Sequence, residues 1–215
     1  MSKQRVHEPL WHIELAVVVA ILIQLFLPNK LFIGPKYLIV VMELLLMVAL
    51  RIMSPITHTK ASRIKRFAGL MLIGVISFAN ISSLILVVQK LINGGQTTGK
   101  QLIVAALAIY LTNIIMFGLM YWALDGGGPG GRGTHQPPVD FLFPQMTTTS
   151  LVTEQPGWKP SFMDYLFISI TVGTAFSPTD AMPLTHRAKL FMSVQALVSL
   201  TTVALLAARA INILG

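Results

Sequence analysis

Residues 102–124 read LIVAALAIYLTNIIMFGLMYWAL, a run without one charged side chain. A stretch of roughly 20 apolar residues is long enough to cross the ~30 Å hydrocarbon layer of a bilayer as a helix. Backbone amides in that layer find no water, so a continuous run of this kind must satisfy them within a helix. The run therefore predicts a membrane-spanning helix.

Four further apolar runs of similar length accompany it, at residues 10–27, 37–53, 67–91 and 188–213. The whole chain is 54% hydrophobic and only 11% charged. A soluble domain has about 25% charged residues, so much of this surface must face lipid. We predict an all-α integral membrane bundle of about five transmembrane helices, multi-pass in the cell (inner) membrane, with the lipid bilayer as a partner.

The net charge of +8 does not indicate nucleic-acid binding, because the basic residues sit in short loops between the runs. An excess of Lys and Arg marks the cytoplasmic side of a membrane protein. With five spans, the N-terminus, the 54–66 loop and the 125–187 region lie on one side, and that side, with the adjoining Arg51 and Lys189, carries 11 of the 16 basic residues. The bias therefore predicts that these three segments are cytoplasmic.

Metal, cofactor and enzyme chemistry are not expected. The chain has no cysteine, and its five histidines show no metal-ligand spacing. No nucleophile, base and orienting group can be placed together from the sequence, so we expect no enzyme activity.

Residues 125–160 interrupt the apolar pattern. The stretch opens DGGGPGGRG and carries several prolines, which prevent a helix from continuing. The glycine tract matches the dinucleotide fingerprint only formally, since no strand precedes it and no helix opens from it. We predict a long loop in which Phe-Leu-Phe-Pro at 141–144 lies at the membrane interface, anchored by Trp158.

The next apolar run, residues 162–176, reads FMDYLFISITVGTAF and is too short to span comfortably. The polar sequence Ser-Pro-Thr-Asp follows at 177–180. A half-helix that ends in irregular backbone is tolerated at membrane depth only where protein or a water-filled cavity surrounds it. The order of these segments predicts a short re-entrant helix, a constriction and an inner helix.

Residues 164–191 resemble, without a gap, the pore region of two-helix potassium channels. Asp164 and Ser169 fall at the start and middle of that family's pore helix, and residues 174–180 lie over its filter motif, Thr-Thr-Val-Gly-Tyr-Gly-Asp. The whole chain also resembles a group of uncharacterised bacterial integral membrane proteins, through the sequences at 125–131, 140–143 and 176–180.

The filter positions depart from the potassium-channel motif. Ser177 and Thr179 replace two glycines whose backbone freedom the motif uses, and Pro178 fixes φ and donates no hydrogen bond. The usual ladder of carbonyl ligands is therefore not expected. The constriction is predicted either to pass a monovalent cation with weak selectivity or to be closed. The predicted ion pathway is Thr174, Ala175, Phe176, Ser177, Pro178, Thr179 and Asp180.

These observations divide the chain into an N-terminal three-helix membrane region, 1–101, and a pore-loop module, 102–215. The leading hypothesis is a channel-like homotetramer, because one pore loop per chain needs several copies around an axis. The alternative is a non-conducting membrane scaffold or partner-binding protein that keeps the pore-loop fold.

Two polar residues inside predicted spans are further candidates. Glu43 lies well inside the 37–53 run, where an ionisable group is a functional hypothesis by default, against a protonated or paired structural carboxyl. Gln195 lies on the presumed inner helix, where it either bonds between helices or serves the ion pathway.

The charge bias and the resemblance disagree about the side of the pore loop. Potassium channels admit the loop from outside, whereas the charge bias puts Pro178 and Asp180 on the cytoplasmic side. Three explanations stay open at this point. The charge rule misleads here, residues 162–178 form a sixth short span, or the loop enters from inside.

Overall fold

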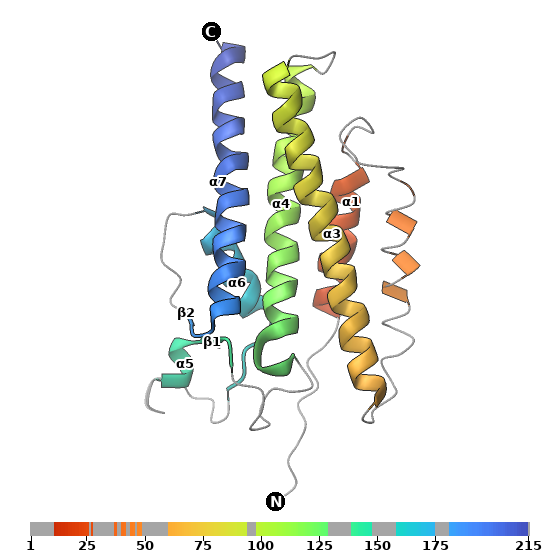
Figure 1. The fold of residues 1–215 in the computed structure, drawn as a ribbon, viewed down its shortest axis with the longest axis vertical. Coiled ribbons are helices and arrows are strands. Elements are labelled where there is room, and N and C mark those ends of the chain that lie inside the picture. Colours follow the sequence, from red (N-terminus) through yellow and green to blue (C-terminus); the bar gives the residue numbers. More distant parts are fainter. Residues whose placement is uncertain are drawn as a thin grey trace, which may run out of the picture.

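The structure is a computed structural model that describes residues 11–25, 27, 60–93, 98–128, 139–147, 158–174 and 181–214, with a few separate residues between 37 and 48. Most of the described chain is helical and forms one bundle (Figure 1). Its longer helices are α1 (Trp11–Leu25), α3 (Lys60–Asn93), α4 (Gly99–Leu124), α6 (Phe162–Thr174) and α7 (His186–Leu214).

Three of these helices are long and apolar enough to cross a membrane: α3 over Phe67–Lys90, α4 with its following turn over Gly99–Gly127, and α7 over His186–Ala208. They match the runs predicted at 67–91, 102–124 and 188–213. Helix α1 matches the first predicted run but is shorter. Most of the 37–53 run lies outside the described residues, so the count of five spans stays a prediction.

Helix α4 is the centre of the bundle and packs against α1, α3, α6 and α7. It starts with a capping box, in which the Thr98 hydroxyl accepts from the Gln101 backbone N–H at 3.4 Å and the Gln101 side chain accepts from the Thr98 N–H at 3.1 Å. An apolar helix with buried residues around most of its circumference belongs inside a bundle, not at its surface.

A small antiparallel sheet closes the end of the bundle where α4 ends and α6 and α7 begin (Figure 1). Strand β1 (Phe141–Leu142) pairs with β2 (Met182–Pro183), with Phe141 opposite Pro183 and Leu142 opposite Met182. This sheet was not part of the all-α prediction. The short helices η2 (Asp125–Gly127) and α5 (Pro144–Thr147) flank β1 in the chain.

The two phenylalanines of the segment at 141–144, predicted to lie at a membrane interface, are buried inside the bundle. Phe141 is 1% exposed and Phe143 is 4% exposed. Phe141 packs edge-on against Tyr121, and Phe143 packs edge-on against Trp158 and Tyr165. These rings form an aromatic core for the end of the bundle, because α4, β1 and α6 converge there.

Candidate functional site

The first half of α6 lies beside the C-terminal end of α4. The Tyr165 hydroxyl donates to the carboxylate of Asp125, the residue that caps α4. About two turns earlier on α4, Gly118 allows the backbone of Leu166 to approach closely, since a Cβ at Gly118 would lie 3.2 Å from the Leu166 Cα. The start of α6 is therefore fixed at this end of the bundle.

The last half of α6 reaches the middle of its neighbours. The Ser169 hydroxyl donates to the carbonyl of Ile114 at 2.6 Å. Gly173 lies against the side chains of Ile114 and Ser199, which are mid-helix residues of α4 and α7. At 1.5 Å per residue, α6 is about 20 Å long, well short of a ~30 Å hydrocarbon layer.

The chain is back at the starting end of α6 by Ala181. Ala181 belongs to the same buried cluster as Phe141, Tyr165 and Ala188, and β2 follows it directly. Since β2 pairs with β1, the segments before and after α6 meet at one end of the bundle (Figure 1). The chain therefore enters and leaves the bundle at the same end on either side of α6. Helix α6 does not carry the chain to the opposite end of the bundle.

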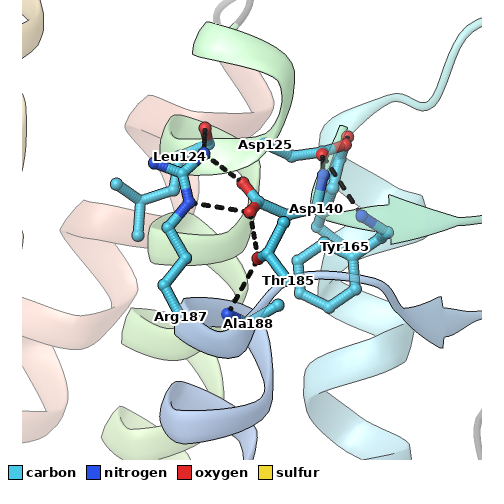
Figure 2. Close-up of polar contacts among 8 residues, drawn as sticks. Leu124, Asp125, Asp140, Tyr165, Thr185, Arg187 and Ala188 are labelled. Atoms are coloured by element: carbon cyan, nitrogen blue, oxygen red, sulfur yellow. Dashed lines mark hydrogen bonds and ion pairs between the residues drawn. The ribbon is translucent and has the colours of Figure 1, made fainter. Parts of the chain in front are cut away.

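Asp125 is the first centre of a polar cluster at this end, shown in Figure 2. Its side chain is 1% exposed. One carboxylate oxygen accepts from the backbone N–H groups of Asp140, at 2.5 Å, and Phe141, at 3.3 Å. The other oxygen accepts from the Tyr165 hydroxyl. One buried carboxylate thus joins α4, the segment leading into β1, and α6.

Asp140 is the second centre. Its carboxylate accepts from Arg187 Nε at 2.7 Å and Arg187 Nη2 at 2.6 Å, and also from the Thr185 hydroxyl. Arg187 also donates to the carbonyl of Leu124 at 3.4 Å (Figure 2). Charge-assisted bidentate pairs of this kind are stronger than neutral hydrogen bonds. We call Asp125, Asp140, Tyr165, Thr185 and Arg187 the polar clamp.

The glycine tract after α4 forms the turn that follows Asp125 of the polar clamp. Gly126, Gly127 and Gly128 have φ of 57°, 86° and 78°, a region that residues with a Cβ rarely adopt. These conformations turn the chain sharply at the end of α4, where the Asp125 carboxylate meets backbone N–H groups 15 and 16 residues further on. In the described residues, the tract is a turn.

A second polar cluster links α4, α6 and α7 in the middle of the bundle. Gln195 is 0% exposed. Its amide nitrogen donates to the Ser169 carbonyl and hydroxyl oxygens, both at 2.7 Å, and its amide oxygen accepts from the Tyr121 hydroxyl at 2.6 Å. Nearby, Asn113 donates to the Ser199 hydroxyl at 3.0 Å. Gln195 therefore bonds between helices inside a single chain.

The other predicted site residues are only partly in view. Thr174 is the last residue of α6, half-buried, and its hydroxyl donates to the Thr171 carbonyl at 3.2 Å. Residues 175–180, the remainder of the predicted ion pathway, and Glu43 lie outside the described residues. Among the residues that the structure describes, no group of three His, Asp or Glu side chains is placed to hold a metal ion.

The sequence reasoning did not identify the polar clamp as a site. Asp125 and Asp140 enter the sequence-based predictions only through the stretches at 125–131 and 140–143, on which a resemblance to bacterial membrane proteins was expected. A usable signal exists, since two of the chain's eight acidic residues bracket a glycine tract and each touches an apolar run. A carboxylate that folding buries needs a charged or hydrogen-bonding partner.

Comparison of the chain with protein-family models, curated proteins and solved structures finds no match.

Proposed function

We propose that this protein is a channel-like membrane protein of the cell (inner) membrane that conducts monovalent cations through an atypical constriction. The observation that carries the proposal is the path of the chain around α6. The chain enters at one end of the bundle, reaches the level of Ile114 and Ser199, and is back at the same end by Ala181. In a bilayer, such a path makes α6 a re-entrant half-helix.

The direction of α6 favours cations over anions. Its C-terminal end is the one that reaches the middle of the bundle. The last carbonyl groups of a helix have no partner within the helix and carry partial negative charge. The last turn of α6 contains no basic residue to neutralise that charge. A cation near this end therefore gains electrostatic stabilisation.

The sequence that follows α6 supplies further oxygen ligands. We assign the proposed ion contacts to the hydroxyls of Thr174, Ser177 and Thr179 and to the carboxylate of Asp180. Irregular backbone at membrane depth must be buried in protein or line a water-filled cavity, which suits a conduction path. With Pro178 in place of the filter tyrosine, the proposal is for weak selectivity and not for a potassium-specific ladder of carbonyls.

Assembly is part of the proposal, because one half-helix cannot enclose a path. Met163, Phe167 and Ile170 form an apolar face of α6 that is exposed in the single chain, and Leu197 and Leu200 of α7 are exposed as well. Such faces suit lipid or the helices of neighbouring copies. We propose a homotetramer, in which part of this surface is buried between copies.

The side of the membrane from which α6 enters can be proposed from the ends of α3 and α6. Helix α3 starts with the basic segment at residues 60–66, at the end of the bundle where α6 also starts (Figure 1). If the basic end is cytoplasmic, α6 enters from the cytoplasm. Of the three explanations left open by the sequence, the proposal adopts entry from inside, because a path that returns to its starting end is not a sixth span.

The test is ion flux in liposomes that contain the purified, oligomeric protein. We expect potassium and sodium flux from the unaltered chain and a several-fold lower flux from Asp180→Asn, which removes the charge at constant size. Glu154→Gln, in the 125–160 segment, is the matched control and should leave the flux unchanged. Absence of flux for both ions in a verified oligomer would contradict the proposal.

A non-conducting scaffold is the second candidate, favoured by a different observation. Three buried polar side chains at the middle of the bundle around α6, those of Ser169, Gln195 and Asn113, bond to groups of the same chain. Asp180→Ala separates the two functions. Changed conductance supports the channel, whereas absent flux in every variant with loss of a co-purifying partner supports the scaffold.

A further inference from the structure

A second set of buried polar residues lies away from α6, between α1, α3 and α4. Ala20 and Ile21 of α1 belong to one apolar cluster with Met116 of α4, whereas Leu27, two residues after the end of α1, belongs to another cluster with Ile109 of α4. Gln24 lies between these positions on α1. Along the bundle, Gln24 is therefore level with the part of α4 between Ile109 and Met116, which contains Thr112.

The same level can be found on α3. Asn80 of α3 donates to the carbonyl of Ile109 at 3.1 Å, which fixes the register of these two helices. Helices α3 and α4 are joined by a short connection at 94–98 and run antiparallel (Figure 1). Three residues back from Asn80 is Ser77, and three residues forward from Ile109 is Thr112. Ser77, Thr112 and Gln24 thus share one level near the middle of α3 and α4.

These three side chains have unused hydrogen-bonding capacity. Both amide atoms of Gln24 and the hydroxyl oxygens of Ser77 and Thr112 are buried and have no hydrogen-bond partner among the described residues. Gln24 is 4% exposed and Thr112 is 0% exposed. Buried polar atoms without a partner are costly and uncommon in folded proteins. In an apolar bundle interior, they indicate a ligand that can donate and accept at once.

We infer that Gln24, Ser77 and Thr112 form a buried hydration site between α1, α3 and α4. Water fits the donor and acceptor set, because an amide and two hydroxyls offer the two to four contacts that an internal water makes. The three side chains are neutral and lack the charge that would hold a dehydrated ion in such an interior. The site is separate from α6 and does not depend on ion conduction.

A double-mutant cycle on thermal unfolding in detergent tests the site. Thr112→Val and Gln24→Leu each remove one partner of the water and strand the other, so each should lower the unfolding midpoint by about 2–4 °C. The double variant removes two of the three polar side chains and leaves only Ser77. Its loss should be clearly smaller than the two single losses combined, because the two residues share one ligand.

Thr202→Val is the matched control. Thr202 is as buried as Thr112, but its hydroxyl donates to the carbonyl of Val198 in its own helix. Its effect should add to that of Gln24→Leu without coupling. The inference is overturned if Thr112→Val and Gln24→Leu each raise the midpoint and their effects add, which is the result expected when unpartnered polar groups are replaced by apolar ones.

Radical oxidation of methionines in the unaltered protein tests the hydration site even if a variant does not fold. A short X-ray pulse generates hydroxyl radicals from bound water, and these oxidise side chains beside it. Met116 is one turn from Thr112 and 1% exposed, whereas Met163 is 54% exposed. Oxidation of Met116 at a rate comparable with that of Met163 supports the hydration site. A Met116 that stays unmodified while Met163 is oxidised overturns it.

Discussion

The carboxylate of Asp140 accepts two hydrogen bonds from the guanidinium of Arg187, at 2.7 Å from Nε and 2.6 Å from Nη2. These residues are 47 positions apart in the chain. Their contact ties the segment that leads into β1 to the first turn of α7. Because α6 and its return path lie between them in sequence, this pair helps to hold both ends of that path at one end of the bundle.

Replacing Asp140 by Asn should destabilise the fold by about 2–4 kcal/mol, because it leaves a charged guanidinium with a weaker partner. The lower part of that range is expected, since the Arg187 side chain is 43% exposed and keeps some access to water. Lys189→Gln, an exposed change in the same turn of α7, should stay within about 0.5 kcal/mol. Unfolding midpoints in detergent give the comparison, and equal effects of the two changes would contradict the role of the clamp.

Tyr165→Phe removes only the hydroxyl that donates to Asp125. Tyr165 is 0% exposed, so the carboxylate loses a buried donor with no water to replace it. We expect a loss of about 1–3 kcal/mol in the free energy of unfolding. Tyr110→Phe, on the half-buried Tyr110 of α4, is the matched control and should cost much less. A Tyr165→Phe variant as stable as the control would show that the contact contributes nothing.

Alanine substitutions at two glycines distinguish the effect of close helix packing on stability from the effect of helix propensity. A Cβ at Gly118 would lie 3.2 Å from the Leu166 Cα, so Gly118→Ala must push α6 away from α4, at a cost of about 1–3 kcal/mol. A Cβ at Gly74 meets nothing within 4 Å, so Gly74→Ala should be neutral or stabilise by up to about 1 kcal/mol. Unfolding midpoints should move in opposite directions or differ clearly. Equal shifts would mean that α6 does not pack on α4 as described.

Gln195→Leu distinguishes a structural from a conducting role for Gln195. The change removes the acceptor of the buried Tyr121 hydroxyl and the amide group that donates to the Ser169 oxygens. We expect a loss of about 1–3 kcal/mol in stability, since single hydrogen bonds between membrane helices contribute modestly. The ratio of potassium to sodium flux should stay the same in protein that remains folded. A changed ratio at unchanged stability would place Gln195 on the ion path instead.

The helices could be predicted because length and apolarity are local properties of the chain. The predicted run 67–91 matches the membrane-crossing part of α3, Phe67–Lys90. The helix itself starts earlier, at Lys60. An apolar run predicts the part of a helix that can lie in the hydrocarbon layer. It does not predict where the helix itself starts, because a helix with basic side chains can extend beyond that layer into water. The start of α6 at Phe162 was also predicted, since the apolar run begins there.

The polar clamp could not be predicted because its contacts are not local. Asp125 pairs with a hydroxyl 40 residues away, and Asp140 pairs with a guanidinium 47 residues away. The sequence indicates a loop at 125–160 but not which of its residues return to the bundle. For the same reason, the β1–β2 pair was missed, since two-residue strands carry no periodic pattern.

The proposed half-helix requires that the chain enters and leaves α6 at one face of the membrane. The chain has no native cysteine, so single cysteines can be labelled cleanly. Met163, at the start of α6, and Met182, after its return, are 54% and 62% exposed and accept substitution. Gln96 lies between α3 and α4 in the sequence, so we expect a cysteine at this position to report the opposite face.

The most direct measurement is labelling of Met163→Cys, Met182→Cys and Gln96→Cys by a membrane-impermeant maleimide in sealed vesicles of known orientation. We predict that positions 163 and 182 react from the same face and position 96 from the other. Reaction of positions 163 and 182 from opposite faces would make α6 part of a crossing and would contradict the half-helix.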